Sequence, residues 1–78
     1  IKTTLYATVY SWDDEITDSL DPNQFIWTRV SEDAEADKLW NSAHYGGAKQ
    51  ITITTEDVKV RATFFCDLID AATRKSLL

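Results

Sequence analysis

Two side chains in this sequence have the chemistry of a nucleophile and a base. Cys66 is the single cysteine and His44 the single histidine among 78 residues, and cysteine catalysis needs a thiolate activated by a positioned base. The surrounding patterns favour structural roles. Cys66 falls on an apolar stretch, where a free cysteine acts as a small hydrophobic side chain, and His44 falls in the last turn of an expected helix, where it suits the dipole. We therefore expect a protein that is not an enzyme.

A run of carboxylates near the N-terminus is the second feature that could do chemistry. Its members are Asp13, Asp14, Glu15, Asp18 and Asp21. Calcium prefers such oxygen ligands, but the run lacks the alternating acids, central glycine and final glutamate of an EF-hand loop. The Gly-Gly pair at 46–47 likewise lacks the Lys-Ser/Thr that follows a phosphate-binding loop. We expect a solvated acidic loop, with no bound metal and no other cofactor.

The charge of the chain is unevenly distributed. Residues 1–37 hold nine acids against two bases, a balance of −7, and residues 38–78 hold four acids against six bases, a balance of +2. An acidic half of this kind disfavours direct binding to phosphate backbones and favours a larger protein partner with a basic surface. The residues expected to bind that partner are Trp12, Asp13, Asp14, Glu15, Asp18, Asp21, Trp27, Glu32, Asp33 and Glu35.

Size, acidity and the lack of a catalytic set make the chain similar to the small inhibitor proteins that phages and mobile elements encode. This likeness is one of composition. It implies an inhibitor that occupies a nucleic-acid-binding site of its partner by charge mimicry. The alternative is a structural or accessory subunit that associates with itself, as a homodimer for example, through an apolar C-terminal helix.

Length and cysteine content limit the architecture to one small domain, residues 1–78. A single cysteine allows no disulfide within the chain and suits a reducing cytoplasm. No apolar run reaches the 18 residues of a membrane span, and no secretory signal pattern is visible. Stability must then come from one compact core, to which nine aromatic residues contribute large areas.

Hydrophobic periodicity locates three elements. Alternation of apolar and polar residues predicts a strand over residues 2–11 and a second over 25–30, which we expect to pair as an antiparallel hairpin around the acidic loop 13–23. Apolar residues at helical spacing predict a helix over 32–45, with Ser31 as its N-cap and Gly46-Gly47 as its end.

The segment 50–72 is open to two interpretations. Residues 51–55 predict a strand. Acids at 56–57 and a polar stripe through Lys59, Thr63, Asp67 and Arg74 then favour one helix over 55–75, with Phe65 and Ile69 buried. Alternation over 58–64 favours instead a β-hairpin followed by a short helix.

Both interpretations give the same class of fold. We expect a small two-layer α+β domain, with a mainly antiparallel sheet of three or four strands and two helices on one face. The order is β-β-α-β-α for the long helix and β-β-α-β-β-α for the hairpin.

Overall fold

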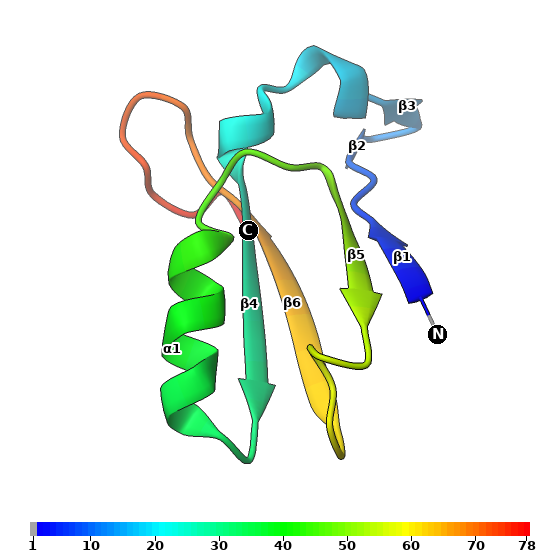
Figure 1. The fold of residues 1–78 in the computed structure, drawn as a ribbon. Coiled ribbons are helices and arrows are strands. Elements are labelled where there is room, and N and C mark those ends of the chain that lie inside the picture. The colour runs from blue at the N-terminus through cyan, green and yellow to red at the C-terminus, as the bar shows by residue number, and fades with distance from the viewer. Residues whose placement is uncertain (1) are drawn as a thin grey trace.

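The fold is described by a computed structural model for residues 2–78 (Figure 1). Its strands are β1 (Lys2–Tyr6), β2 (Tyr10–Ser11), β3 (Asp14–Glu15), β4 (Phe25–Ser31), β5 (Gln50–Thr54) and β6 (Ala62–Leu68). Two 3₁₀ turns, η1 (Thr17–Ser19) and η2 (Pro22–Gln24), lie between β3 and β4, and the helix α1 (Ala34–Ala43) follows β4. The α+β class is therefore confirmed for the part of the chain described.

Two antiparallel ribbons form the body of the domain. β1 pairs with β5, with Lys2 opposite Thr54 and Tyr6 opposite Gln50. β4 pairs with β6, with Phe25 opposite Leu68. The helix α1 runs along the outer side of β4 (Figure 1). Strands that are distant in sequence are thus neighbours, and the two ribbons pack against each other through their buried side chains.

The core lies between the two ribbons. Trp27 of β4 packs against Ile51 and Ile53 of β5, and partly buried side chains from β1, α1 and β6 surround them. Trp27 is only 5% exposed, and its indole nitrogen donates a hydrogen bond of 2.9 Å to the backbone oxygen of Ala48. Buried tryptophan needs such a partner. This bond joins β4 to the segment that leads into β5.

The helix begins later than the sequence predicted. Asp33, not Ser31, is the N-cap, and its carboxylate accepts a bond of 3.0 Å from the amide of Ala36. Ser31 is the last residue of β4, and its hydroxyl donates to the carboxylate of Asp37 at 2.8 Å. Ser31 cannot be the N-cap because it is paired with Ala62 as the last residue of β4. The predicted glycine end is wrong, because α1 ends at Ala43 with His44 as its C-cap. Gly46 and Gly47 both have φ of 100°, but they lie in the turn beyond Tyr45.

The long helix expected over 55–75 is wrong. Asp57, expected in the first turn of that helix, accepts a 2.8 Å bond from the amide of Thr54 in a turn and a 3.2 Å bond from the indole of Trp40. The chain then enters β6 at Ala62. Phe65 points outward and is 54% exposed, whereas Ile69 is buried as expected. This segment is a strand because it pairs with β4, and the pairing provides hydrogen-bond partners for the backbone of alternate residues of β6.

The hairpin alternative is correct only in placing a strand here. β6 begins at Ala62, four residues after the expected start, and it pairs with β4 instead of β5. The described residues after Leu68 form turns without the expected short helix. One helix therefore replaces the expected two, and two-stranded ribbons replace one sheet of three or four strands.

The first expected hairpin is also wrong. β4 does not pair with β1, because β1 is paired with β5 and β4 with β6. The expected strand over residues 2–11 is interrupted after Tyr6. Its last two residues turn away as β2 and form a separate small hairpin with β3.

Candidate functional site

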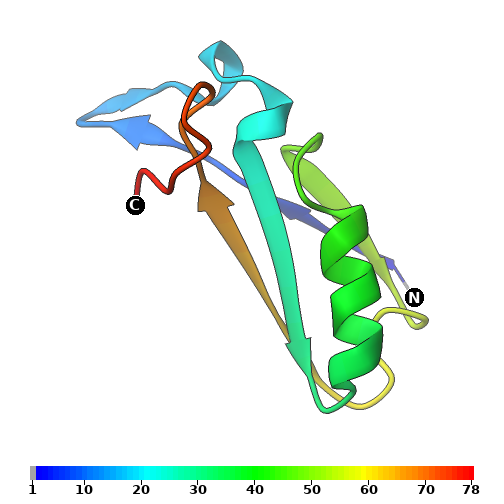
Figure 2. The ribbon, with the colours of Figure 1, turned by 90° about the vertical axis from the view of Figure 1, so that its left-hand side faces the viewer.

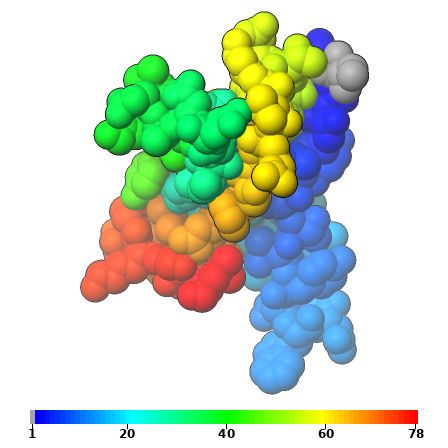
Figure 3. Space-filling model, turned by 90° about the horizontal axis from the view of Figure 1, so that it is seen from below, coloured from blue at the N-terminus to red at the C-terminus, as the bar shows by residue number. Residues whose placement is uncertain are grey.

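A small hairpin projects from the body of the domain. β2 and β3 pair with Tyr10 opposite Glu15 and Ser11 opposite Asp14, so Trp12 and Asp13 form a two-residue turn at its tip. Figure 2 shows the hairpin extending to one side, and Figure 3 shows its light-blue atoms standing clear of the C-terminal segment. We call residues 10–15 the acidic hairpin.

The tip of the acidic hairpin is an exposed tryptophan. Trp12 is 96% exposed and has a φ of 58°, in the left-handed region. Hairpin turns use positive φ at this position, but they usually place glycine or asparagine there. A bulky residue in this region is strained, and such strain tends to mark functional sites. The ring is therefore presented to solvent at a cost in backbone energy.

Hydrogen bonds at its base fix the acidic hairpin to the body. The amide of Ile16 donates to the oxygen of Val9 at 2.8 Å, and the amide of Val9 donates to the hydroxyl of Thr17 at 2.8 Å. The ammonium of Lys49 donates to the backbone oxygen of Thr17 at 2.8 Å. The first two bonds close the base of the hairpin, and the bond from Lys49 joins it to the segment before β5. The hairpin is thus a fixed arm with a free tip.

Acids surround Trp12 on this arm. Asp13, Asp14, Glu15 and Asp18 are all exposed. Asp21 is exposed as well, but its carboxylate accepts a 2.8 Å bond from the amide of Asn23 and caps η2. Four of the acids predicted to bind a partner therefore follow the exposed ring closely in sequence. Within residues 2–78, no hydrogen bond or ion pair engages their carboxylates.

The remaining predicted acids lie elsewhere. Glu32, Asp33 and Glu35 are exposed at the turn from β4 to α1, at the far end of β4 from the acidic hairpin (Figure 1). Trp27 is in the core, so its side chain is unavailable to a partner. The acidic half of the sequence is thus divided into two separate surfaces. The strand β4 separates them because it crosses the domain from one end to the other.

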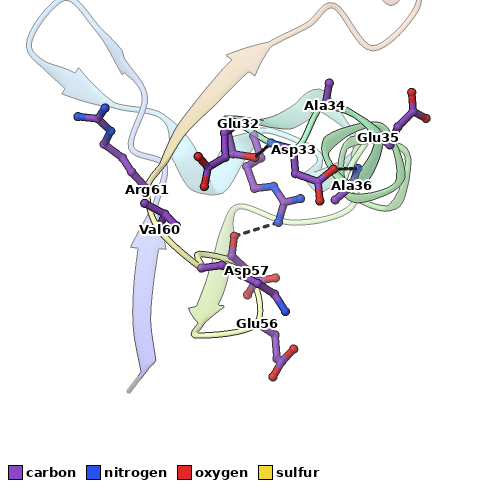
Figure 4. Close-up of a pocket in the computed structure, with 12 residues that line it drawn as sticks. Glu32, Asp33, Ala34, Glu35, Ala36, Glu56, Asp57, Val60 and Arg61 are labelled. Carbon is purple, nitrogen blue, oxygen red and sulfur yellow. Dashed lines mark hydrogen bonds between the residues drawn. The ribbon is translucent and has the colours of Figure 1, made fainter.

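A hollow of about 500 Å³ adjoins this second acidic surface. The first turn of α1 and the end of β4 form one wall, and the loop between β5 and β6 forms the other (Figure 4). Lys59 and Arg61 of that loop are among the residues that line the hollow, as are Glu32 and Asp33. Charges of both signs line this hollow, so it favours neither anions nor cations as a class.

A buried ion pair lies beneath the hollow. The Nε of Arg29 donates to the carboxylate of Asp37 at 2.6 Å, and both residues are buried. The Nη1 of Arg29 donates to the backbone oxygen of Asp57 at 2.9 Å. Burial alone raises the pKa of Asp37, but hydrogen bonds from Ser31 and Arg29 outweigh it, and the pKa lies below its usual value. The pair ties α1 to β4 and to the loop after β5.

The pair also leaves the charge balance of the N-terminal half unchanged. Arg29 and Asp37 compensate each other inside the fold, and eight acids and Lys2 remain in residues 1–37. In the sequence, the signal for this pairing was that Arg29 shares one face of the strand with Phe25 and Trp27.

Neither candidate for nucleophilic chemistry is activated. Burial, followed by the charge of Asp67, raises the pKa of the Cys66 thiol to about 11, which opposes formation of a thiolate. The ring of His44 stacks on Trp40 with centroids 3.7 Å apart, and its Nδ1 lies 2.6 Å from the oxygen of Trp40. Both side chains have packing roles. Within residues 2–78, no three His, Cys, Asp or Glu residues are grouped to hold a metal ion.

Two exposed tyrosines extend the aromatic surface beyond the predicted set. Tyr6 and Tyr10 are both mainly exposed. Tyr10 belongs to the acidic hairpin, next to Trp12 in β2 and its turn. The alternation of Tyr6, Thr8 and Tyr10 with apolar residues was the signal for this outward face.

Comparisons with known proteins add no relative. No protein-family model, no curated protein and no solved structure matches the chain. Among the helices of residues 2–78, none combines the length and the apolar character needed to cross a membrane.

Proposed function

We propose that this protein is a non-enzymatic binding module that docks on a basic surface of a larger protein through the acidic hairpin. The observation that carries the proposal is Trp12, which is 96% exposed at a strained turn. Tryptophan is enriched among the residues that dominate binding energy at protein interfaces. A ring held in solvent on a fixed arm is suited to enter a pocket on a partner.

The flanking carboxylates support a basic partner. Asp13, Asp14, Glu15 and Asp18 place four formal negative charges at exposed positions close in sequence to the ring. Charge complementarity of this kind accelerates association and selects partners, and its effect declines as salt increases. Proteins that bind nucleic acids present basic surfaces, so the proposal includes inhibition of such a protein by occupation of its nucleic-acid site.

The test begins with capture of a partner from cells of the source on the immobilised protein. Binding of the purified partner is then measured at several salt concentrations. Neutralising Asp13, Asp14, Glu15 and Asp18 to their amides should slow association and flatten its salt dependence. Trp12→Gly should weaken binding about 30-fold, mainly through faster dissociation, as expected for an interface residue worth about 2 kcal/mol.

A matched control is available at the other acidic surface. Glu32→Gln with Glu35→Gln removes charge at the far end of β4 and should leave association nearly unchanged. The proposal fails if amides at positions 13, 14, 15 and 18 together leave affinity and its salt dependence as they were. Competition with nucleic acid for the captured partner tests the inhibitor form separately.

A further inference from the structure

β6 has one paired side and one free side. Alternate residues of an antiparallel strand direct their backbone groups to opposite sides. The amide of Ile69 donates to Gln24 next to β4 at 2.9 Å, so the odd-numbered residues of β6 bond to β4. The oxygen of Leu68 accepts from the amide of Leu77 at 2.8 Å on the opposite side. Ala62, Phe64 and Cys66 therefore direct their amides and oxygens away from β4.

Before Leu68, this free side has no hydrogen-bonding partner within residues 2–78. No backbone or side-chain hydrogen bond reaches the backbone groups of Ala62, Phe64 or Cys66 from that part of the chain. In Figure 2, β4 lies between β6 and α1, and no strand lies along the other side of β6. Proteins usually protect such edges with proline, inward charges or bulges, and residues 62–66 contain none of these.

The outer face of β6 is complementary to itself in charge. Its odd-numbered residues are Arg61 just before the strand, then Thr63, Phe65 and Asp67. A basic residue stands three positions before Phe64 and an acidic residue three positions after it. Two copies of such a strand, paired antiparallel about Phe64, place each Arg61 opposite the Asp67 of the second copy.

We propose that β6 is a self-association edge, and that two copies of this chain pair through it, antiparallel and centred on Phe64. In this register Phe64 faces its own equivalent and Ala62 faces Cys66 of the second copy. All of these residues direct their backbone groups to the free side, as the hydrogen-bonded positions of an antiparallel pair require. If the register shifted by one residue, the free backbone groups of one copy would lie opposite residues of the second copy whose backbone groups are already bonded to β4.

The same register also uses the side chains. Each Arg61 meets an oppositely charged Asp67, whose Oδ1 accepts a 2.8 Å bond from the hydroxyl of Ser76 and whose other oxygen remains for a partner. Shifting by two residues, which keeps the backbone pattern, would remove the alignment of Arg61 with Asp67. Phe65, 54% exposed in one copy, then lies beside Thr63 of the second. Aromatic and charged cross-strand pairs both stabilise antiparallel sheets.

The assembly that results is closed and symmetric. The two β4–β6 ribbons become one four-stranded sheet. Because the contact is isologous, it pairs the free edge of both copies and leaves no β6 edge for a third copy. The contact ends where Leu77 bonds Leu68. This edge is separate from the acidic hairpin, so the proposal does not depend on the function proposed above.

Sedimentation over a range of protein concentrations tests the proposal. The unaltered chain should show a reversible monomer–dimer equilibrium. Arg61→Asp should weaken the dimer about tenfold or more, because attraction becomes repulsion at two symmetric sites. Combining Arg61→Asp with Asp67→Arg should restore it. Lys59→Asp makes the same change in charge outside the aligned pair and should have little effect.

Amide hydrogen exchange supplies a measurement without substitutions. The amides of Ala62, Phe64 and Cys66 should become protected as protein concentration rises, while amides of the acidic hairpin should not. A chain that remains monomeric at millimolar concentration overturns the proposal. So does a dimer that Arg61→Asp leaves unchanged, or one whose formation protects other amides instead.

Discussion

Replacing Trp12 with glycine should stabilise the fold slightly, although it removes a large aromatic ring. The ring is 96% exposed, so its removal forfeits almost no packing. The backbone at this position has a φ of 58°, which costs a residue with a side chain about 1–2 kcal/mol and glycine almost nothing. Glycine also gives the unfolded chain more freedom, at a cost of about 0.5–1 kcal/mol. The net effect expected is a gain of roughly 0 to 1.5 kcal/mol.

Equilibrium unfolding in urea measures this effect. Trp27 and Trp40 remain as fluorescent reporters of the core and helix. Ser11→Gly is the matched control, because Ser11 is the neighbouring exposed residue in β2 with no positive φ. Glycine at position 11 relieves no backbone strain, so Ser11→Gly should lower the free energy of unfolding by about 0.5–1 kcal/mol. The free energy of unfolding should therefore be about 1–2 kcal/mol higher for Trp12→Gly than for Ser11→Gly.

Either of two results would refute the reasoning. If Trp12→Gly is destabilised as much as Ser11→Gly, then Trp12 is not held in the left-handed region. If it is destabilised more, the ring packs on the body of the protein and is not free to act as an anchor. The function proposed for the acidic hairpin would lose its main support in both cases.

Three further predictions concern the fold. Gly46→Ala should cost about 1 kcal/mol or more beyond Gly47→Ala in urea unfolding, because both have φ of +100° but only the first places a Cβ 3.0 Å from a backbone oxygen. Burial raises the pKa of Asp37, and hydrogen bonds from Ser31 more than offset it, so the pKa is lowered. Its contribution to stability is then complete above the unfolded pKa of about 3.9 and is lost as pH falls through the folded pKa; Asp37→Asn should flatten this acid loss in unfolding curves. Burial raises the pKa of Cys66 from 9.0 to about 11, so alkylation at pH 9 should be at least about tenfold slower than in the unfolded chain, and equal rates would contradict the packing of this thiol.

The sequence by itself determined the features that depend on local patterns. Apolar residues at helical spacing located α1 to within about two residues at each boundary. Alternation located β4. The exposure of Trp12 and its acidic neighbours was consistent with a turn between two strands, although the small hairpin itself was not predicted.

Only the tertiary structure decided which strands pair. The segment after Thr54 has a helical polar stripe and a strand alternation at once, and nothing local separates them. The choice was made by residues far away, because β4 pairs with β6, and both Trp40 and Thr54 bond Asp57 where a helix would have begun.

The division of the acidic half has the same origin. Residues 13–18 and 32–35 both belong to the acidic N-terminal half of the sequence, but β4 crosses the domain between them and places them at opposite ends (Figure 1). Composition counts charges without regard to position. Their arrangement, like the free edge of β6, follows from non-local strand pairing, which sequence periodicity does not encode.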